Sequence, residues 1–212
     1  MGLDFNERPA AGEPAGLLFL HHGRGADERD LIGLAEVIDP ARRLHVITPG
    51  GPLRLSGWPG RHWYTVPRVG HPDPETFDAS FAALADFHDR TWERLGIGPE
   101  RTVLGGFSMG AVMSYSLGLA SDRPAPAGIL AFSGFIPTVD GWEPSIADRV
   151  DLSALIAHGR LDNVISADFA HAARDLLEGA GLPVEYHESE VAHQIDPATI
   201  SPSRDWLERT LP

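Results

Sequence analysis

The segment from Thr102 to Leu119 constrains the fold more strongly than any other part of the chain. A short apolar run, Val103-Leu104, leads into Gly-Gly-Phe-Ser-Met-Gly at 105–110, and residues 109–119 then have the character of a helix. A G-x-S-x-G pattern between a strand and a helix is typical of a sharp turn that presents a nucleophilic serine. The backbone passes so close to this serine that a Cβ atom two residues before or after it would clash. The segment therefore predicts an α/β fold in which the Ser108 hydroxyl stands above a sheet.

Apolar runs and amphipathic segments alternate along the rest of the chain. The runs predict buried strands at 16–21, 45–48, 127–133 and 155–158, and an alternating pattern predicts an edge strand at 184–188. Capping residues and apolar faces predict helices that begin after Asp27, at Asp73-Pro74, at Ser166 and at Ser201-Pro202. We therefore expect one α/β domain over residues 1–212, with a mostly parallel sheet and helices on both faces.

Composition narrows the chemistry that the chain can support. Cysteine and lysine are absent from its 212 residues, which excludes disulfides, thiolate chemistry, Schiff bases and a P-loop lysine. The net charge of −13 argues against nucleic acid and anionic membranes as partners. The first residues lack an apolar signal core and no run reaches membrane-spanning length, so we expect a cytoplasmic protein without stable membrane insertion.

Several polar residues lie where predicted strands end. They are His22-Gly23, Ser108, Ser133-Gly134, Asp162 and His193. Because the carboxyl ends of parallel strands meet at one edge of a sheet, we expect these residues to lie together. A serine hydroxyl becomes an effective nucleophile when a base takes its proton and a third group orients that base. The chain order of serine, acid and histidine is the order found in α/β-hydrolases.

Three histidines follow a plausible acid, and their positions differ. His171 falls within a predicted helix away from its apolar face, and His187 falls within the last strand, where a side chain points sideways from the sheet. His193 lies in the loop after that strand and can overhang the serine, so it is the favoured base, with His187 as the alternative. Asp162 is the favoured acid because it follows the strand at 155–158, although an aspartate that caps its own turn has the same sequence pattern.

Charge that develops on a substrate oxygen would need fixed hydrogen-bond donors. The backbone N–H of Met109, directly after the serine, is one candidate. The N–H of Arg24, in the loop after the first long strand, is the other, and Gly23 would allow close approach there. The side chain of Arg24 could equally be an ordinary solvated arginine.

Two long segments, 49–72 and 137–150, lack a regular pattern and are expected to be irregular loops. The first contains Trp58, Trp63 and Tyr64. These aromatic residues could line the apolar wall of a binding site or anchor the loop in the core, and the sequence leaves both interpretations open.

As an ordered set, these motifs resemble the phospholipase/carboxylesterase family, which includes acyl-protein thioesterases and small bacterial carboxylesterases. The resemblance rests on H-G-x-G-A-D-E-x-D-L at 22–31, G-F-S-M-G-A at 106–111, F-S-G-F-I-P at 132–137, H-G-x-x-D-x-V-I at 158–165 and A-H-Q-I at 192–195. It implies an α/β-hydrolase fold in a minimal form without a large cap domain. It also implies a serine hydrolase of carboxylic esters, with thioesters and lysophospholipids as further candidate substrates, that uses no cofactor and no metal.

The resemblance also implies roles for individual residues. The catalytic triad would be Ser108, Asp162 and His193, and the oxyanion donors would be the N–H groups of Arg24 and Met109. Gly23, Trp63 and Tyr64 would lie beside the substrate, the aromatic pair resembling a family motif next to the acyl-binding groove.

Two departures from the family pattern move the expectation toward small bacterial esterases. Met109 stands where family members usually carry glutamine, and the N-terminal hairpin common in the family is mostly missing. We expect a small-molecule ester as the substrate, with a short or medium acyl group because Trp58, Trp63 and Tyr64 offer an apolar wall, and we expect a monomer or homodimer. The alternatives are a peptidase or lactone hydrolase on the same triad, and a non-catalytic binding protein that keeps the hydrolase shell.

Overall fold

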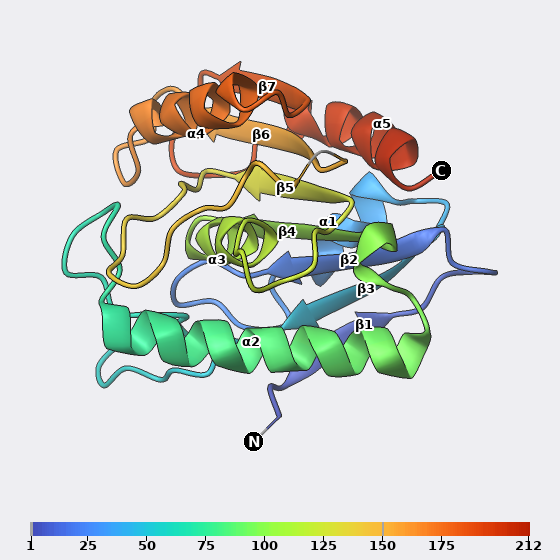
Figure 1. Ribbon diagram of the computed structural model, residues 1–212, viewed down its shortest axis with the longest axis horizontal. Coiled ribbons are helices and arrows are strands. Elements are labelled where there is room, and N and C mark those ends of the chain that lie inside the picture. The colour runs from blue at the N-terminus through green and yellow to red at the C-terminus, as the bar shows by residue number, and fades with distance from the viewer. Residues whose placement is uncertain (1, 150) are drawn as a thin grey trace.

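A seven-stranded sheet lies at the centre of the computed structural model, which describes residues 2–149 and 151–212 (Figure 1). The strands are β1 (Phe5–Arg8), β2 (Gly16–His21), β3 (Leu44–Pro49), β4 (Thr102–Phe107), β5 (Gly128–Phe132), β6 (Ser153–Gly159) and β7 (Val184–Ser189). Their spatial order is β1-β3-β2-β4-β5-β6-β7. β1 pairs antiparallel with β3, and the other neighbouring strands in this described part pair in parallel. The predicted mostly parallel sheet is therefore confirmed.

Helices cover both faces of the sheet, as predicted. They are α1 (Ile32–Ile38), α2 (Pro74–Leu95), α3 (Met109–Gly118), α4 (Ala167–Gly179) and α5 (Ile200–Thr210), with short 3-10 turns at Pro99–Arg101 and Pro197–Thr199. α2, α3 and α4 pack on one face, while α1 and α5 pack on the other. Figure 1 shows the long α2 beside β1, where the rings of Phe5 and Phe87 pack together, and α4 beside β6 and β7.

The central strand β2 shows why its sequence is a continuous apolar run. Leu17 and Phe19 belong to the core under α2 and α3, whereas Leu18 and Leu20 belong to the core under α1 and α5. All four side chains are fully buried, since successive residues of a strand point to opposite faces. Burial of each such side chain contributes roughly 1.5–3 kcal/mol to folding.

Helix α2 follows its sequence signals closely. Asp73 accepts a hydrogen bond from the Thr76 N–H, Pro74 occupies the first turn, and Gly96 ends the helix with φ of 64°. A proline in the first turn loses no intrahelical hydrogen bond, and glycine tolerates the left-handed conformation that ends the helix.

Helix α1 differs from the expectation. Asp27 does not cap it, because the Asp27 carboxylate accepts hydrogen bonds from the N–H and guanidinium of Arg29. The helix begins at Ile32 without a side-chain cap, and its Val37 side chain is exposed.

The segment expected to be irregular at 49–72 contains only isolated bridges, such as Leu53 with His62, between the end of β3 and α2. The expected loop at 137–150 includes Val150, and the expected domain includes Met1. Both residues lie outside the described part of the chain. No helix of residues 2–149 and 151–212 is long and apolar enough to cross a membrane.

Candidate active site

Ser108 occupies the apex of the turn between β4 and α3. Its backbone has φ of 55° and ψ of −121°, a conformation that a residue with a side chain rarely adopts. Such a residue costs about 1–3 kcal/mol and persists only where its surroundings hold it. The Ser108 N–H is held by the carbonyl of Phe132 at 2.8 Å, and Ser108 itself is nine-tenths buried.

Two glycines make this turn possible. A Cβ atom on Gly106 would lie 2.5 Å from the carbonyl carbon of Gly110. A Cβ atom on Gly110 would lie 2.0 Å from the carbonyl oxygen of His21. The expected clashes on both sides of the serine are confirmed, and the second one shows that α3 begins directly against the end of β2.

The structure brings three of the residues singled out in the sequence into one hydrogen-bonded row. His193 Nε2 lies 2.8 Å from Ser108 Oγ, and His193 Nδ1 lies 2.6 Å from Asp162 Oδ2. The imidazole also packs against the ring of Phe107, with 4.9 Å between the ring centroids. The three side chains come from the ends of β4, β6 and β7, which meet at one edge of the sheet.

The loops after β6 and β7 meet because their backbones are hydrogen-bonded to each other. The Arg160 N–H donates to the carbonyl of Ser189 at 2.7 Å, and the Leu161 N–H donates to the carbonyl of Val191 at 3.0 Å. Gly159 allows this approach, since a Cβ atom there would lie 2.3 Å from the Val191 oxygen. These contacts place Asp162 beside His193, which follows Val191 by two residues.

The Asp162 carboxylate is buried and well supplied with donors. Burial raises its pKa, but the N–H groups of Ile165 and Val164, each 2.8 Å from Oδ1, and the contact with His193 lower it, and the pKa lies below its ordinary value. On the other side of Oδ2, His158 Nε2 lies 3.4 Å away while it donates to the Ile165 carbonyl at 2.9 Å. Asp162 is therefore ionised near neutral pH and accepts from His193 Nδ1–H, which leaves Nε2 as the acceptor for the Ser108 hydroxyl.

The other two histidines considered as bases lie on the surface. His171 Nε2 contacts Glu188 at 2.6 Å, and His187 Nε2 contacts Glu185 at 2.8 Å. The structure brings neither of them to Ser108.

A cavity of about 450 Å³ opens beside Ser108. It is lined by Gly23, Arg24, Ala26, Asp30, Tyr64, Val66, Val69, Phe107, Ser108, Met109, Phe135, Val164, Ile165 and His193. The two expected oxyanion donors, on Arg24 and Met109, belong to residues of this wall. Neither N–H has a backbone partner within the described residues, and the first N–H of a helix such as α3 has none by geometry.

The aromatic residues of the 49–72 segment divide between wall and core. Tyr64 lines the cavity, but Trp63 is fully buried and does not. The indole N–H of Trp63 donates to the His22 carbonyl at 2.9 Å. Trp63 therefore anchors the loop in the core and does not make the direct contact with the substrate that the resemblance implied. Trp58 is 54% exposed, and the Arg24 guanidinium lies 4.1 Å from the centre of its ring.

Other residues of the apolar wall were missed in the sequence. Phe135 and Val164 belong to motifs that follow strand ends, and this position in the sequence could have indicated that they lie near the site. Val66 and Val69 lie in the irregular segment, where no periodicity separates a cavity residue from any other loop residue.

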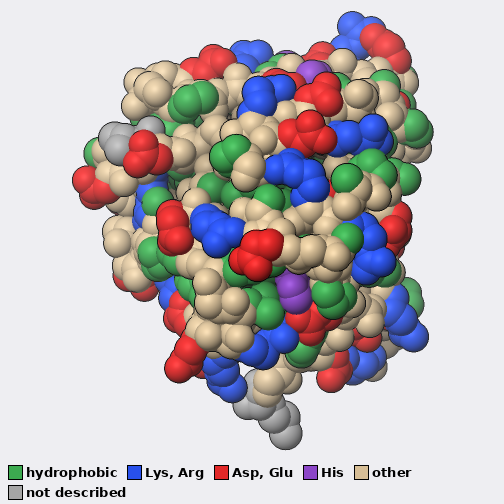
Figure 2. Space-filling view, turned by 90° about the vertical axis from the view of Figure 1, so that its right-hand side faces the viewer, with side chains coloured by type: hydrophobic (Ala, Val, Ile, Leu, Met, Phe, Trp, Pro, Cys, Tyr) green, Lys and Arg blue, Asp and Glu red, His purple; other side chains and the backbone are tan. Residues whose placement is uncertain are grey.

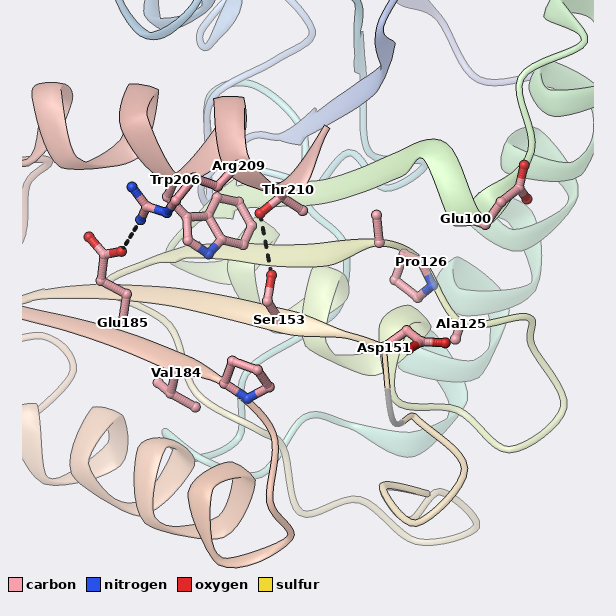
Figure 3. A pocket seen from close by; sticks show the side chains of 12 residues that line it. Glu100, Ala125, Pro126, Asp151, Ser153, Val184, Glu185, Trp206, Arg209 and Thr210 are labelled. Carbon is pink, nitrogen blue, oxygen red and sulfur yellow. Dashed lines mark hydrogen bonds and ion pairs between the residues drawn. The ribbon is translucent and has the colours of Figure 1, made fainter. Parts of the chain in front are cut away.

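A larger hollow of about 800 Å³ lies at the opposite end of the sheet, where β5, β6 and β7 begin (Figure 3). Figure 3 shows Arg209 directed at Glu185 and Thr210 directed at Ser153, so these four polar side chains form two pairs. Figure 2 looks onto this end of the molecule, where acidic and basic side chains are intermingled. No histidine lines the hollow, and it offers no nucleophile with a base.

No group of three or more histidine and carboxylate side chains in residues 2–149 and 151–212 could hold a metal ion.

The comparisons with known proteins agree with this geometry. The family described as phospholipase/carboxylesterase matches residues 7–211 of the chain. The chain belongs to the phospholipase/carboxylesterase family. Acyl-protein thioesterase 1 of Yarrowia lipolytica is 27% identical over 216 residues, which cover 95% of this chain and 94% of the relative.

Solved structures of similar fold include two esterases. The Bacillus cereus carboxylesterase has a TM-score of 0.84 at 24% identity, over 98% of this chain and 94% of that chain. Esterase PE8 has a TM-score of 0.82 at 27% identity, over 99% of this chain and 100% of that chain. As a member of the phospholipase/carboxylesterase family with an α/β-hydrolase fold, the protein is an esterase-type serine hydrolase. These findings do not favour a peptidase, a lactone hydrolase or a non-catalytic binding protein.

Proposed function

We propose that the protein hydrolyses carboxylic esters and thioesters of small molecules through an acyl-enzyme on Ser108. The observation that carries this proposal is the row Ser108–His193–Asp162, with distances of 2.8 and 2.6 Å, at the wall of an apolar cavity. Acyl-protein thioesterase and carboxylesterase relatives support the ester and thioester classes.

The first half of the reaction forms the acyl-enzyme. Ser108 Oγ attacks the carbonyl carbon of the ester while its proton passes to His193 Nε2. Asp162 stabilises the imidazolium that results, and the N–H groups of Arg24 and Met109 donate to the oxyanion. The carbon–oxygen bond to the alcohol then breaks, and the alcohol leaves with the proton from His193.

The second half regenerates the enzyme. A water molecule attacks the acyl carbon, and His193 takes one of its protons. The second tetrahedral intermediate collapses, the acid leaves, and the proton returns to Ser108 Oγ. Asp162 remains ionised throughout, since it accepts hydrogen bonds on both oxygens.

The cavity supports a substrate with a short or medium acyl group. Its volume of about 450 Å³ falls within the range of ordinary small-molecule sites, roughly 300–1,000 Å³. Val66, Val69 and Phe135 give it apolar walls that complement an alkyl chain. Met109 and Tyr64 extend this surface next to Ser108.

The test is turnover of p-nitrophenyl esters from acetate to palmitate by the native protein and by Ser108→Ala. We expect the native rate to be highest for short and medium chains. We expect Ser108→Ala to lose turnover by a factor of about 10⁴ or more, because removal of the nucleophile removes the acyl-enzyme route. Undiminished turnover by a folded Ser108→Ala protein would refute the proposed function, and a steady rise up to palmitate would refute the chain length.

A further inference from the structure

His22 follows β2 and is almost completely buried, although no step of the reaction uses its ring. Its Nδ1 atom lies 2.7 Å from the carbonyl oxygen of Gly23, which can only accept a hydrogen bond. Its Nε2 atom lies 2.9 Å from the backbone N–H of Gly51, which can only donate. The two contacts require a neutral imidazole with its proton on Nδ1.

The carbonyl oxygen of Gly23 accepts hydrogen bonds from two donors. One is His22 Nδ1–H, and the other is the N–H of Ala26, at 3.2 Å. The peptide bond between Gly23 and Arg24 is trans, so its C=O and N–H groups point in opposite directions. The Arg24 N–H therefore points away from the His22 ring. Both Gly23 and Arg24 line the cavity that contains Ser108.

Trp63 connects this loop to the other expected oxyanion donor. Its indole N–H donates to the His22 carbonyl at 2.9 Å, and its backbone N–H donates to the sulfur of Met109 at 3.3 Å. The rings of His22 and Trp63 also pack together, with 5.1 Å between their centroids. The segments that carry the two donors are thus attached to the same buried tryptophan.

We propose that His22 is a positioning residue whose neutral Nδ1–H tautomer turns the Gly23–Arg24 peptide so that the Arg24 N–H faces the substrate oxyanion. The inference rests on the proposed function, because it gives that N–H a role in ester hydrolysis. His22 itself touches neither the substrate nor the reacting atoms.

The surroundings of His22 favour its neutral form. Burial lowers the pKa of His22, the hydrogen bond to the Gly23 carbonyl and the carboxylates of Asp30, Asp27 and Glu28 raise it, and the pKa lies below the ordinary value. A second proton would place an N–H on Nε2 against the Gly51 N–H, so a charged ring would lose that contact.

Two substitutions separate the two contacts of the ring. In His22→Asn the amide nitrogen can take the place of Nδ1 and still donate to Gly23. In His22→Gln the amide oxygen can take the place of Nε2 and accept from Gly51, but the donor to Gly23 is lost. We expect His22→Gln to lower kcat about 30-fold with little change in KM, and His22→Asn to stay within about threefold of the native kcat; loss of one oxyanion donor costs about 10²–10³ in other hydrolases.

An inhibitor provides a readout that a general loss of structure does not give. An alkyl trifluoromethyl ketone forms a tetrahedral oxyanion on the serine, so its Ki for His22→Gln should rise by the factor by which kcat/KM falls. In the native protein, ¹⁵N NMR of His22 should show the Nδ1–H tautomer from pH 6 to 8. An Nε2–H tautomer, or a folded His22→Gln protein with native kcat and Ki, would overturn the role of His22 while Ser108→Ala still tests the reaction separately.

Discussion

At the scale of single residues, the Asp162 carboxylate is held by contacts on both of its oxygens. Both backbone donors to Oδ1 come from its own loop, and Oδ2 faces His193 on one side and His158 on the other. The side chain is completely buried, so the carboxylate has no alternative solvent partner. Its charge and its orientation are therefore set by residues 158–165 before any substrate binds.

This arrangement makes Asp162→Asn a specific test of orientation. An amide in place of the carboxylate would present an N–H to His193 or to the backbone donors, and the ring would lose the tautomer that accepts from Ser108. We expect kcat to fall by about 10³–10⁴ with little change in KM, as for the corresponding change in a serine protease. Steady-state kinetics on a p-nitrophenyl ester measure this. The control is Asp175→Asn on α4, where the carboxylate is exposed, and a loss of similar size there would contradict the assignment.

The sequence allowed the triad residues to be singled out, but it did not reveal how Trp63 is used. Ser108, Asp162 and His193 each follow a strand, so strand order alone predicts that they meet. Trp63 lies in an irregular segment, and its indole partner, the His22 carbonyl, is 41 residues away in the chain. Because no local sequence pattern encodes such a contact, the sequence did not show whether Trp63 lines the cavity or is buried in the core.

At the scale of elements, the turn between β4 and α3 depends on backbones that nearly touch. Gly106 and Gly110 face each other across the turn, and Gly110 also faces the end of β2. Neither clash involves a flexible side chain that could move aside. The turn, the start of α3 and the loop after β2 consequently form one rigid unit.

Gly110→Ala should break this unit. Its Cβ atom would overlap the carbonyl oxygen of His21, at 2.0 Å, and that of His22, at 2.6 Å. We expect the free energy of unfolding to fall by about 3 kcal/mol, because overpacking against backbone cannot relax cheaply. Urea denaturation measures this loss.

Gly179→Ala in α4 is the matched control for Gly110→Ala. Nothing lies within 4 Å of a Cβ atom at Gly179, so we expect a gain of about 0.5–1 kcal/mol. Equal stability of the two variants would show that the close approach at Gly110 does not constrain the fold.

The start of a helix was predicted well where the capping carboxylate binds the donors of that helix. α2 begins at Pro74 because the Asp73 carboxylate has the Thr76 N–H and hydroxyl as its partners. The start of α1 was placed too early, since Arg29 competes for the carboxylate of Asp27. A sequence pattern identifies a capable cap, but it does not show which donor takes the carboxylate.

At the scale of the whole molecule, a buried polar row crosses the layer between α2, β2 and α3. His88 Nε2 lies 3.2 Å from His21 Nε2, His21 Nδ1 lies 2.8 Å from Ser114 Oγ, and the Ser114 hydroxyl donates to the Gly110 carbonyl at 3.0 Å. In one consistent arrangement both rings are neutral. His88 Nε2–H then donates to His21 Nε2, and His21 Nδ1–H donates to Ser114 Oγ. Burial lowers the pKa of His21 to about 3 and lowers the pKa of His88 well below its ordinary value.

These two histidines predict a loss of stability in acid. In the unfolded chain a histidine titrates near pH 6.5, while in the folded chain His21 stays neutral down to about pH 3. Between these values the unfolded chain binds the extra protons, so the free energy of unfolding falls as the pH drops below 6.5. Each histidine contributes a slope of about 1.4 kcal/mol per pH unit.

The measurement is urea denaturation at several pH values between 6.5 and 4.5. His88→Phe should make the slope shallower by about 1.4 kcal/mol per pH unit, because one buried titrating group is gone. His171→Gln, which removes an exposed imidazole, is the control. An unchanged slope in His88→Phe would rule out this source of acid sensitivity.

The loops after β6 and β7, which are hydrogen-bonded to each other, carry only part of the proposed active site. Its residues come from two separate portions of the polypeptide. The nucleophile and both oxyanion donors come from residues 16–118, whereas the acid and the base come from residues 153–193. During synthesis the first portion emerges with Ser108 but without a base, and also without the Phe132 carbonyl that holds the Ser108 N–H. Ester turnover should therefore begin only once the last two strands have joined the sheet, which would make activity a sensitive reporter of completed folding.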